Sequence, residues 1–129
     1  AKNGVDVRIM TPGTPDKKLV FLLTQSYYRQ LLENGVKIYE YQPGFLHAKT
    51  FVCDDEIAVV GTINLDYRSL YLHFEDGVWI YGNDVIWSMK EDFVQTLEDC
   101  HTVPLEFCKN RKIPVRIMQN VLRAFAPML

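Results

Sequence analysis

Apolar and polar residues alternate at the start of the chain and then recur with a helical spacing. Val5, Val7 and Ile9 alternate with polar neighbours, which predicts a strand that ends in the Pro/Gly-rich segment 11–15. A helix is expected next, capped by Asp16 and stopped by a left-handed Gly35. The stripe of apolar residues that predicts a buried helix face consists of Leu19, Leu23, Tyr27 and Leu31.

A second apolar segment, 36–41, completes a strand–helix–strand unit. The right-handed crossover of such a unit places its two strands parallel in one sheet. The runs 46–53 and 57–61 then flank three acidic residues, which predicts an antiparallel hairpin. With a three-residue turn, paired positions have numbers that sum to 110, so Gly61 lies opposite Lys49 and leaves room beside that lysine for a ligand.

The second half of the chain is also expected to mix helices and strands. A short helix is expected from Asp66, and residues 77–81 form a further strand. Asn83 or Asp84 caps a helix that ends before Pro104. Its apolar side carries Ile86, Met89, Phe93, Leu97 and Cys100, and Pro114 falls in the first turn of a last helix. With 129 residues, 48% of them hydrophobic, the chain is predicted to form one compact α/β unit.

The last segment, 113–129, is predicted to be an amphipathic and basic helix. The formal net charge of −2 hides an asymmetry, since residues 1–106 carry nine basic and sixteen acidic side chains while residues 107–129 carry five basic ones and no acid. Two interpretations stay open: the helix lies on an anionic membrane, or its apolar stripe docks on the domain's own sheet. The stripe consists of Ile113, Ile117, Val121 and Phe125.

Cysteine usage and the apolar runs bear on the compartment. Cys53, Cys100 and Cys108 form an odd set without C-x-x-C spacing, which favours a reducing, cytosol-facing compartment over a disulfide framework. The longest apolar run is far shorter than the roughly 20 residues that span a bilayer. Because the chain lacks an initiator Met and reaches its first strand at once, we expect it to be a fragment of a longer protein.

One constellation of polar residues has no packing explanation. His47 and Lys49 are two apart on a predicted strand, so both side chains leave the same face and one phosphate can touch both. A lysine and the amide of Asn64 can hold the charge that develops on a phosphodiester without a metal. His47 can act as nucleophile or as proton donor, provided that an acceptor fixes its second ring nitrogen.

The pattern H-x-K-x4-D-x6-G-T-x-N, residues 47–64, resembles the HKD signature of the phospholipase D superfamily. The wider stretch 46–75 looks most like the last HKD motif of a bacterial cardiolipin synthase. The resemblance implies the phospholipase D α/β sandwich, a mixed sheet flanked by helices, of which this chain forms a part. It also implies a phosphohistidine intermediate and metal-independent catalysis with no cofactor.

The resemblance assigns roles to individual residues. It implies that His47, Lys49 and Asn64 face the phosphate and that Glu75, 28 residues after the histidine, orients the imidazole, with Gly61 and Thr62 supporting the phosphate. Thr62 stands where serine is commoner in the family, which keeps the hydroxyl. His73 stands where the family usually has Asn, and Asp76 stands where it usually has an apolar residue. These departures concern the substrate preference that the resemblance implies and not the reaction class.

Asp54 supplies the third letter of the motif but is assigned a structural role. Seven residues of extended chain separate it from His47, roughly 23 Å at about 3.3 Å per residue, so the two cannot touch one phosphate. We expect Asp54 to bond backbone groups of the turn. His73 and His101 are expected to be structural, and Asp66 and Arg68 to brace the loop after Asn64.

With one H-x-K, the chain is predicted to hold half of an active site. By resemblance, the other half comes from a second HKD motif in the missing part or in a homodimer partner, and phosphatidylglycerol is converted to cardiolipin at an anionic membrane. His47 is favoured as general acid and base over nucleophile. A hydrolytic phospholipase D or a homodimeric phosphodiesterase or nuclease is the first alternative, although the acidic body disfavours nucleic acid. A catalytically silent membrane-binding module is the second, and the four intact site residues speak against it.

Overall fold

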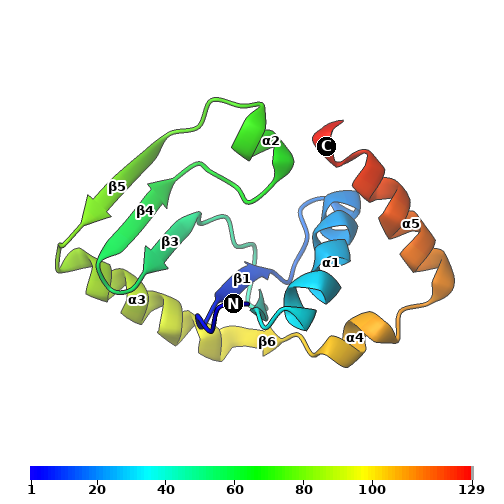
Figure 1. Cartoon of the computed structure of the whole chain (residues 1–129), viewed down its shortest axis with the longest axis horizontal. Coiled ribbons are helices and arrows are strands. Elements are labelled where there is room, and N and C mark those ends of the chain that lie inside the picture. Colours follow the sequence, from blue (N-terminus) through cyan, green and yellow to red (C-terminus); the bar gives the residue numbers. More distant parts are fainter. Residues whose placement is uncertain (129) are drawn as a thin grey trace. The chain divides into compact units, whose positions relative to one another are not determined.

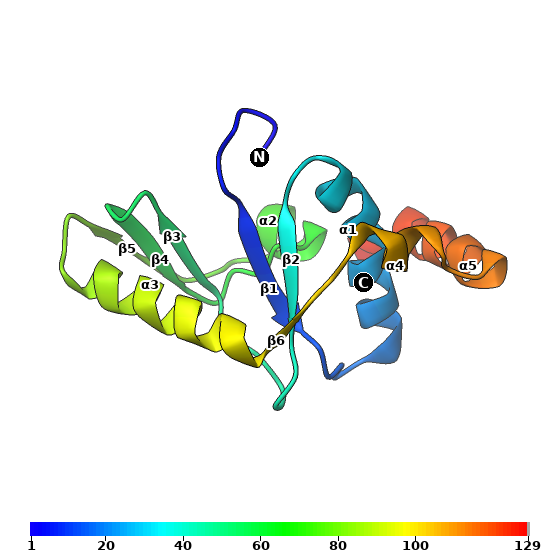
Figure 2. The same cartoon turned by 90° about the horizontal axis from the view of Figure 1, so that it is seen from below.

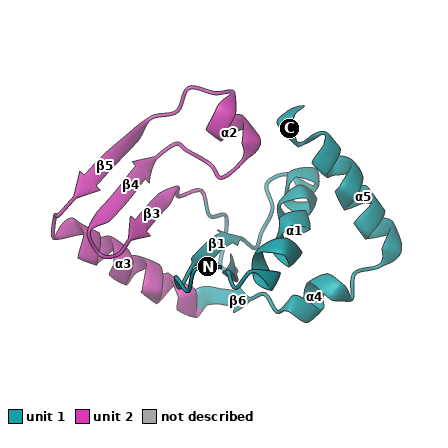
Figure 3. Cartoon of the chain, viewed as in Figure 1, with its two compact units in different colours: residues 1–46, 99–129 teal, residues 47–98 magenta. Residues whose placement is uncertain are grey.

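The computed structural model describes residues 1–128, which form two compact units (Figures 1 and 3). Unit 1 comprises residues 1–46 and 99–129, and unit 2 comprises residues 47–98. The expected α/β fold is confirmed, since five helices accompany two three-stranded sheets. The expectation of one unit differs from the structure because segment 47–98 builds a sheet of its own.

Unit 1 is built on a mixed sheet in the order β1-β2-β6 (Figure 2). The predicted parallel pairing of the first two strands is confirmed, with Arg8 opposite Lys37, and β6 joins antiparallel. Strand β1 extends further toward Pro12 than predicted, because an edge strand tolerates a proline that donates no hydrogen bond. The elements are β1 Arg8–Pro12, α1 Lys18–Glu33, β2 Lys37–Tyr41, β6 Cys100–Thr102, α4 Leu105–Lys109, α5 Ile113–Ala124 and a 3₁₀ helix Ala126–Met128.

Helix α1 buries only part of the predicted stripe, in which Leu31 packs against the core. Leu19 and Tyr27 are exposed, whereas Tyr28 is buried. Residues four apart drift by about 40° around a helix at each step, so a long i, i+4 stripe cannot stay on one face. Asp16 is not the N-cap, which is Lys17 without a side-chain hydrogen bond, but Gly35 has the expected positive φ of +86°. The core of unit 1 consists of Tyr28, Ile38, Val103 and Cys108.

Unit 2 is an antiparallel sheet in the order β3-β4-β5, accompanied by α3 (Figure 1). The predicted hairpin and its register are confirmed, since Thr50 pairs with Val60 and Cys53 with Ile57. Ala58 of β4 and Ile86 of α3 are fully buried. The elements are β3 Thr50–Cys53, β4 Ile57–Gly61, α2 Tyr67–Tyr71, β5 Gly77–Tyr81, α3 Val85–Thr96 and a 3₁₀ helix Leu97–Asp99.

The chain after α3 departs from the prediction. The helix expected to run through Cys100 toward Pro104 ends at Thr96, and residues 100–102 form β6 instead. The Val103 N–H donates to the Ile38 carbonyl at 2.9 Å, so backbone pairing with a distant strand replaces the last helical turns. At the start of α3, the side-chain oxygen of Asn83 accepts a hydrogen bond from the Val85 N–H at 3.0 Å.

Helix α5 buries Gln119 and Leu122 and leaves its predicted apolar stripe exposed. Gln119 and Leu122 are buried where α5 contacts α1, while Ile113 is 70% and Ile117 is 59% exposed. The interpretation in which this stripe docks on the sheet of its own domain is therefore wrong. The helix ends at Ala124, short of the predicted 129, a position outside the described residues. No helix within residues 1–128 has the length and apolar character needed to cross a membrane.

Candidate active site

The His47–Lys49 segment lies directly before β3, outside the regular strand. The sheet pairing begins at Thr50, so the predicted strand 46–53 is shorter than expected and strand alternation does not fix the side-chain directions of this segment. His47 is exposed and Lys49 is half-buried. The Lys49 ammonium donates to the His47 carbonyl oxygen at 2.7 Å, which ties the two motif residues together.

Gly61 lies opposite Lys49 as predicted, but the need for glycine at this position has a different reason from the one expected. The Gly61 N–H donates to the Lys49 carbonyl oxygen at 3.2 Å, extending the hairpin register by one pair. A Cβ at Gly61 would collide with the Asp76 carbonyl oxygen and lie 2.7 Å from the Gly77 Cα. The expectation of open space beside the lysine is therefore wrong, because β5 approaches at this point.

Thr62 connects the end of β4 to Glu75. Its hydroxyl donates to Glu75 Oε2 at 2.5 Å and accepts from the Asp76 N–H at 3.0 Å, and its own N–H donates to the Asp76 carbonyl at 2.9 Å. Both donor and acceptor capacity of the hydroxyl are used. This explains why a residue with a β-hydroxyl follows the glycine of the motif: it positions a carboxylate.

The surroundings of Glu75 favour its charged form. The hydrogen bond from Thr62 lowers the pKa of the Glu75 carboxyl below its ordinary value, and the Ser69 hydroxyl and the charge of Lys49 act in the same direction. A carboxyl whose pKa is lowered by folding stabilises the folded chain above its ordinary pKa. That contribution is lost as the pH falls through the lowered value.

Replacing Thr62 tests this arrangement. We expect Thr62→Val to raise the Glu75 pKa toward its ordinary value, because the strongest hydrogen bond to the carboxylate is lost, while Thr62→Ser leaves the pKa low. The measurement is an NMR titration of the Glu75 side-chain carboxyl in each variant. An unchanged Glu75 pKa in Thr62→Val, with the fold intact, would show that another group holds this carboxylate.

Asn64 is linked to the same network through a residue that sequence reasoning did not single out. The Asn64 amide lies 3.4 Å from the Ser69 hydroxyl, and the Ser69 hydroxyl in turn lowers the Glu75 pKa as a hydrogen-bonding partner. Ser69 is held by the N-cap of α2, since its N–H donates to Asp66 Oδ1 at 2.7 Å. The sequence signal that could have pointed to Ser69 is its spacing from Asp66, because the residue three positions after an N-cap commonly donates its N–H to the capping side chain.

Asp66 and Arg68 brace the loop after Asn64, as predicted, and Arg68 does so through His73. Arg68 Nε donates to His73 Nε2 at 2.7 Å, which requires that ring nitrogen to be unprotonated. The His73 N–H also donates to the Arg68 carbonyl at 2.9 Å. Together with the Asp66 cap, these contacts close the segment between β4 and β5.

Asp54 lies at the end of β3 away from His47, in the hairpin turn. It adopts a left-handed φ of 51° and accepts a weak hydrogen bond from the Cys53 thiol at 3.4 Å. The next residue, Asp55, also has a positive φ, of 60°, and pairs with Lys90 at 2.6 Å. Among the described residues Asp54 makes no side-chain hydrogen bond to the turn backbone, contrary to expectation, and it shapes the turn through its backbone conformation, which Asp tolerates better than most residues.

The structure thus shows three polar contacts along this segment, Lys49 with the His47 carbonyl, Thr62 with Glu75 and Asn64 with Ser69, and the Lys49 charge and the Ser69 side chain help to lower the Glu75 pKa. The pairing of Glu75 with the His47 imidazole stays a prediction. Within the described part of the chain, no group of three or more His, Cys, Asp or Glu side chains is arranged to hold a metal ion. The chemistry available to the candidate site is electrostatic stabilisation and proton transfer at a phosphate.

Comparison with known families decides the relationship. Residues 1–97 match the family model described as cardiolipin synthase, PLD-like domain. The chain belongs to this family. All the candidate site residues of the cardiolipin synthase motif, His47 to Glu75, fall within the matched range.

Relatives match this cardiolipin synthase-family chain along its whole length. A protein of Streptococcus mutans is 49% identical over 129 residues, and proteins named cardiolipin synthase from Clostridium perfringens strain SM101 and Geobacillus sp. strain WCH70 are 46% and 42% identical. Each alignment covers 100% of this chain and between 26% and 28% of the relative. The chain therefore spans about a quarter of the length of the relatives it matches.

Proposed function

We propose that this chain supplies one half of the active site of a phospholipase D-type phosphatidyltransferase that makes cardiolipin from two phosphatidylglycerol molecules. The observation that carries the proposal is the H-x-K segment, in which Lys49 binds the His47 carbonyl oxygen, together with the hydrogen-bonded pairs Thr62–Glu75 and Asn64–Ser69. Family membership supports the reaction class, and the names of the relatives support the lipid product.

The proposed reaction has two steps and uses two histidines. A histidine nitrogen attacks the phosphorus of one phosphatidylglycerol, and the released glycerol alkoxide takes a proton from the second histidine. That second histidine then removes the proton from a headgroup hydroxyl of another phosphatidylglycerol, whose oxygen displaces the histidine from phosphorus. We assign the acid and base role to His47 and the nucleophile to the second motif, with Lys49 and Asn64 holding the phosphate oxygens.

The product mixture tests this function. The full-length protein, meaning a chain of the relatives' length that contains these 129 residues, is expected to convert phosphatidylglycerol vesicles to cardiolipin and free glycerol. The rate is expected to be undiminished in EDTA, because the resemblance to the phospholipase D superfamily implies metal-independent catalysis. Products are separated by lipid mass spectrometry. Phosphatidic acid as the main product would indicate a hydrolytic phospholipase D, and cleavage of DNA without lipid turnover a nuclease. Either result would overturn the proposed transfer.

Charge supports a lipid over a nucleic acid as the substrate. Unit 2, which carries the candidate site, has three basic and ten acidic residues and therefore a formal charge of −7, whereas unit 1 has eleven basic and six acidic residues and a charge of +5. Binding of nucleic acid requires many phosphate contacts from Lys and Arg around the site. With three basic residues, the acidic unit 2 does not provide such a surface.

We also propose a reducing compartment for the chain, which the three free cysteines suit.

The outward stripe of α5 is proposed to contact an anionic membrane. Replacing Ile117 and Val121 with Ser is expected to weaken binding to phosphatidylglycerol vesicles by several fold, because both apolar side chains are exposed and leave water on insertion. The control is Gln95→Ser, a change on the exposed surface of α3. Binding is measured by vesicle sedimentation with the 129-residue chain. Unchanged sedimentation of the double variant would exclude this stripe as the membrane contact.

A further inference from the structure

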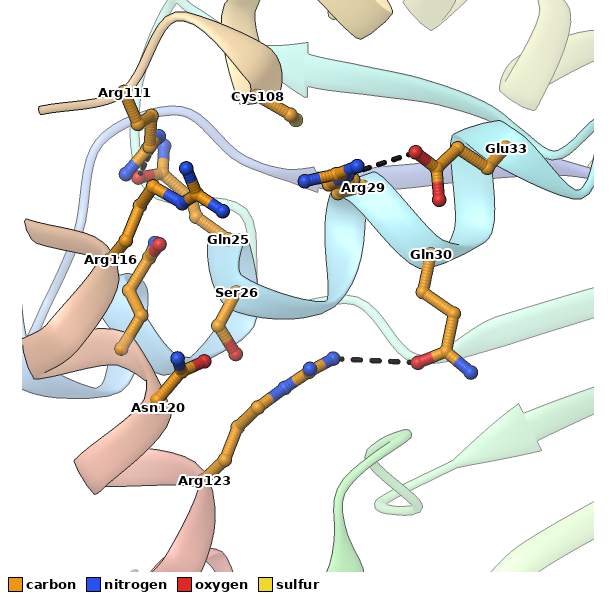
Figure 4. Close-up of a pocket in the computed structure, with 11 residues that line it drawn as sticks. Gln25, Ser26, Arg29, Gln30, Glu33, Cys108, Arg111, Arg116, Asn120 and Arg123 are labelled. Atoms are coloured by element: carbon orange, nitrogen blue, oxygen red, sulfur yellow. Dashed lines mark hydrogen bonds and ion pairs between the residues drawn. The ribbon is translucent and has the colours of Figure 1, made fainter. Parts of the chain in front are cut away.

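A second polar site lies in unit 1, on the inward side of α5 (Figure 4). It is a pocket of about 220 Å³ between α1 and the α4–α5 segment, and four of its lining residues are arginines. Arg29 comes from α1, Arg111 from the α4–α5 connection, and Arg116 and Arg123 from α5. All of its lining residues belong to unit 1, so it is a different site from the candidate active site in unit 2.

Hydrogen-bond donors outnumber acceptors in this pocket. Each guanidinium offers five N–H donors, and the lining contains one carboxylate, Glu33, which already pairs with Arg29 at 2.8 Å. Arg111 donates to Gln25 Oε1 at 2.7 Å, and Arg123 reaches Gln30 Oε1 at 3.5 Å, the limit of a hydrogen bond. Protein acceptors therefore satisfy only part of the available N–H groups.

Arg116 and Arg123 are the least satisfied members. No hydrogen bond or ion pair among the described residues involves the Arg116 guanidinium, which Figure 4 shows directed toward Gln25 and Arg111. Arg123 lies over the Tyr27 ring at 4.4 Å, and its buried Nε has no hydrogen-bond partner in the described structure. The neighbouring guanidinium groups repel one another, and buried N–H donors without an acceptor cost free energy. A bound anion offsets both effects.

We propose that this pocket binds a phosphate group. Guanidinium groups bind phosphate and carboxylate oxygens in a bidentate manner, and convergence of arginines from three segments fits an anion with several oxygens better than a monocarboxylate. Ser26 and Asn120, which Figure 4 shows between α1 and α5, add neutral polar groups. The phosphate is either free in solution or part of a phospholipid headgroup, and the same donors serve both.

The test uses the 129-residue chain, inorganic phosphate and NMR at constant ionic strength set with chloride. Phosphate is expected to shift the Arg123 Nε–H signal and the Asn120 and Ser26 amides with one saturating isotherm. Arg116→Gln is expected to raise the Kd at least tenfold, and Arg116→Lys to give a smaller rise because lysine cannot bind bidentately. The matched control is Lys109→Gln, which removes the same charge outside the pocket.

A second arm distinguishes the sources of the phosphate. If the natural ligand is a headgroup, vesicles of phosphatidylglycerol in phosphatidylcholine shift the same signals and Arg116→Gln weakens vesicle binding; if it is free phosphate, only the soluble ion does so. Both outcomes support the site. Failure of phosphate to saturate these signals, or an equal loss of affinity in Lys109→Gln and Arg116→Gln, would overturn it. Because no turnover is measured, failure here is distinct from failure of the proposed transferase function.

Discussion

His47→Ala and Lys49→Ala in the full-length protein are each expected to lower phosphatidyl transfer by about 10²–10⁴-fold. The histidine variant loses the group proposed to protonate the leaving glycerol. The lysine variant loses the cation that stabilises charge on the phosphate oxygens and also the contact from Lys49 Nζ to the His47 carbonyl at 2.7 Å. The measurement is glycerol release from phosphatidylglycerol vesicles, with thermal unfolding recorded for each variant.

Two controls separate chemistry from folding. Asp54→Asn is expected to keep turnover, because asparagine tolerates the left-handed φ of 51° at this turn and the position lies at the far end of β3 from His47. Lys109→Ala removes a lysine charge in unit 1 and is also expected to leave turnover unchanged. Loss of turnover in Asp54→Asn without a change in melting temperature would contradict the structural role assigned to the aspartate.

Elements whose causes are local were predictable from the sequence. The hairpin register follows from three turn residues and two apolar runs, and it places Gly61 opposite Lys49 as expected. The Asp66 cap of α2 and the β1–β2 parallel pairing follow from equally short-range chemistry and from the handedness of crossovers. The same is true of the motif itself, whose residue types and spacing predicted the family.

Features that depend on distant segments were not predictable. Strand β6 has three residues and exists because it pairs with β2, about sixty positions earlier in the chain. The need for glycine at position 61 comes from β5, which passes where a side chain would lie. The buried face of α1 is set by Gln25, Tyr28 and their partners on other elements, which the i, i+4 spacing of leucines does not reveal.

The same dependence on distant segments explains the partial prediction of the candidate site. The residue types predicted a polar constellation, but the sequence did not indicate the hydrogen bonds among its neighbours. Thr62 binds Glu75 directly, and the Asn64 amide lies 3.4 Å from the Ser69 hydroxyl. Both links join residues separated by a helix or a turn, so they follow from the three-dimensional path of segment 62–76 and not from its periodicity.

A strictly monomeric sample of the 129-residue chain is expected to show little or no phosphatidyl transfer. One H-x-K motif supplies one histidine, whereas covalent catalysis with protonation of the leaving group needs two positioned groups. The full-length protein, or a homodimer that brings two copies of His47 together, is expected to restore activity. The effect is as large as that of removing a catalytic residue, because half of the catalytic groups are absent.

The decisive measurement is turnover of phosphatidylglycerol and of a chromogenic phosphodiester by this chain, with the oligomeric state established by analytical ultracentrifugation at the assay concentration. The full-length protein is assayed in parallel, with and without His47→Ala. The half-site account predicts no turnover by the monomer and turnover by the full-length protein that is lost in His47→Ala. Robust turnover by the monomeric chain, or full activity of the His47→Ala protein, would contradict it.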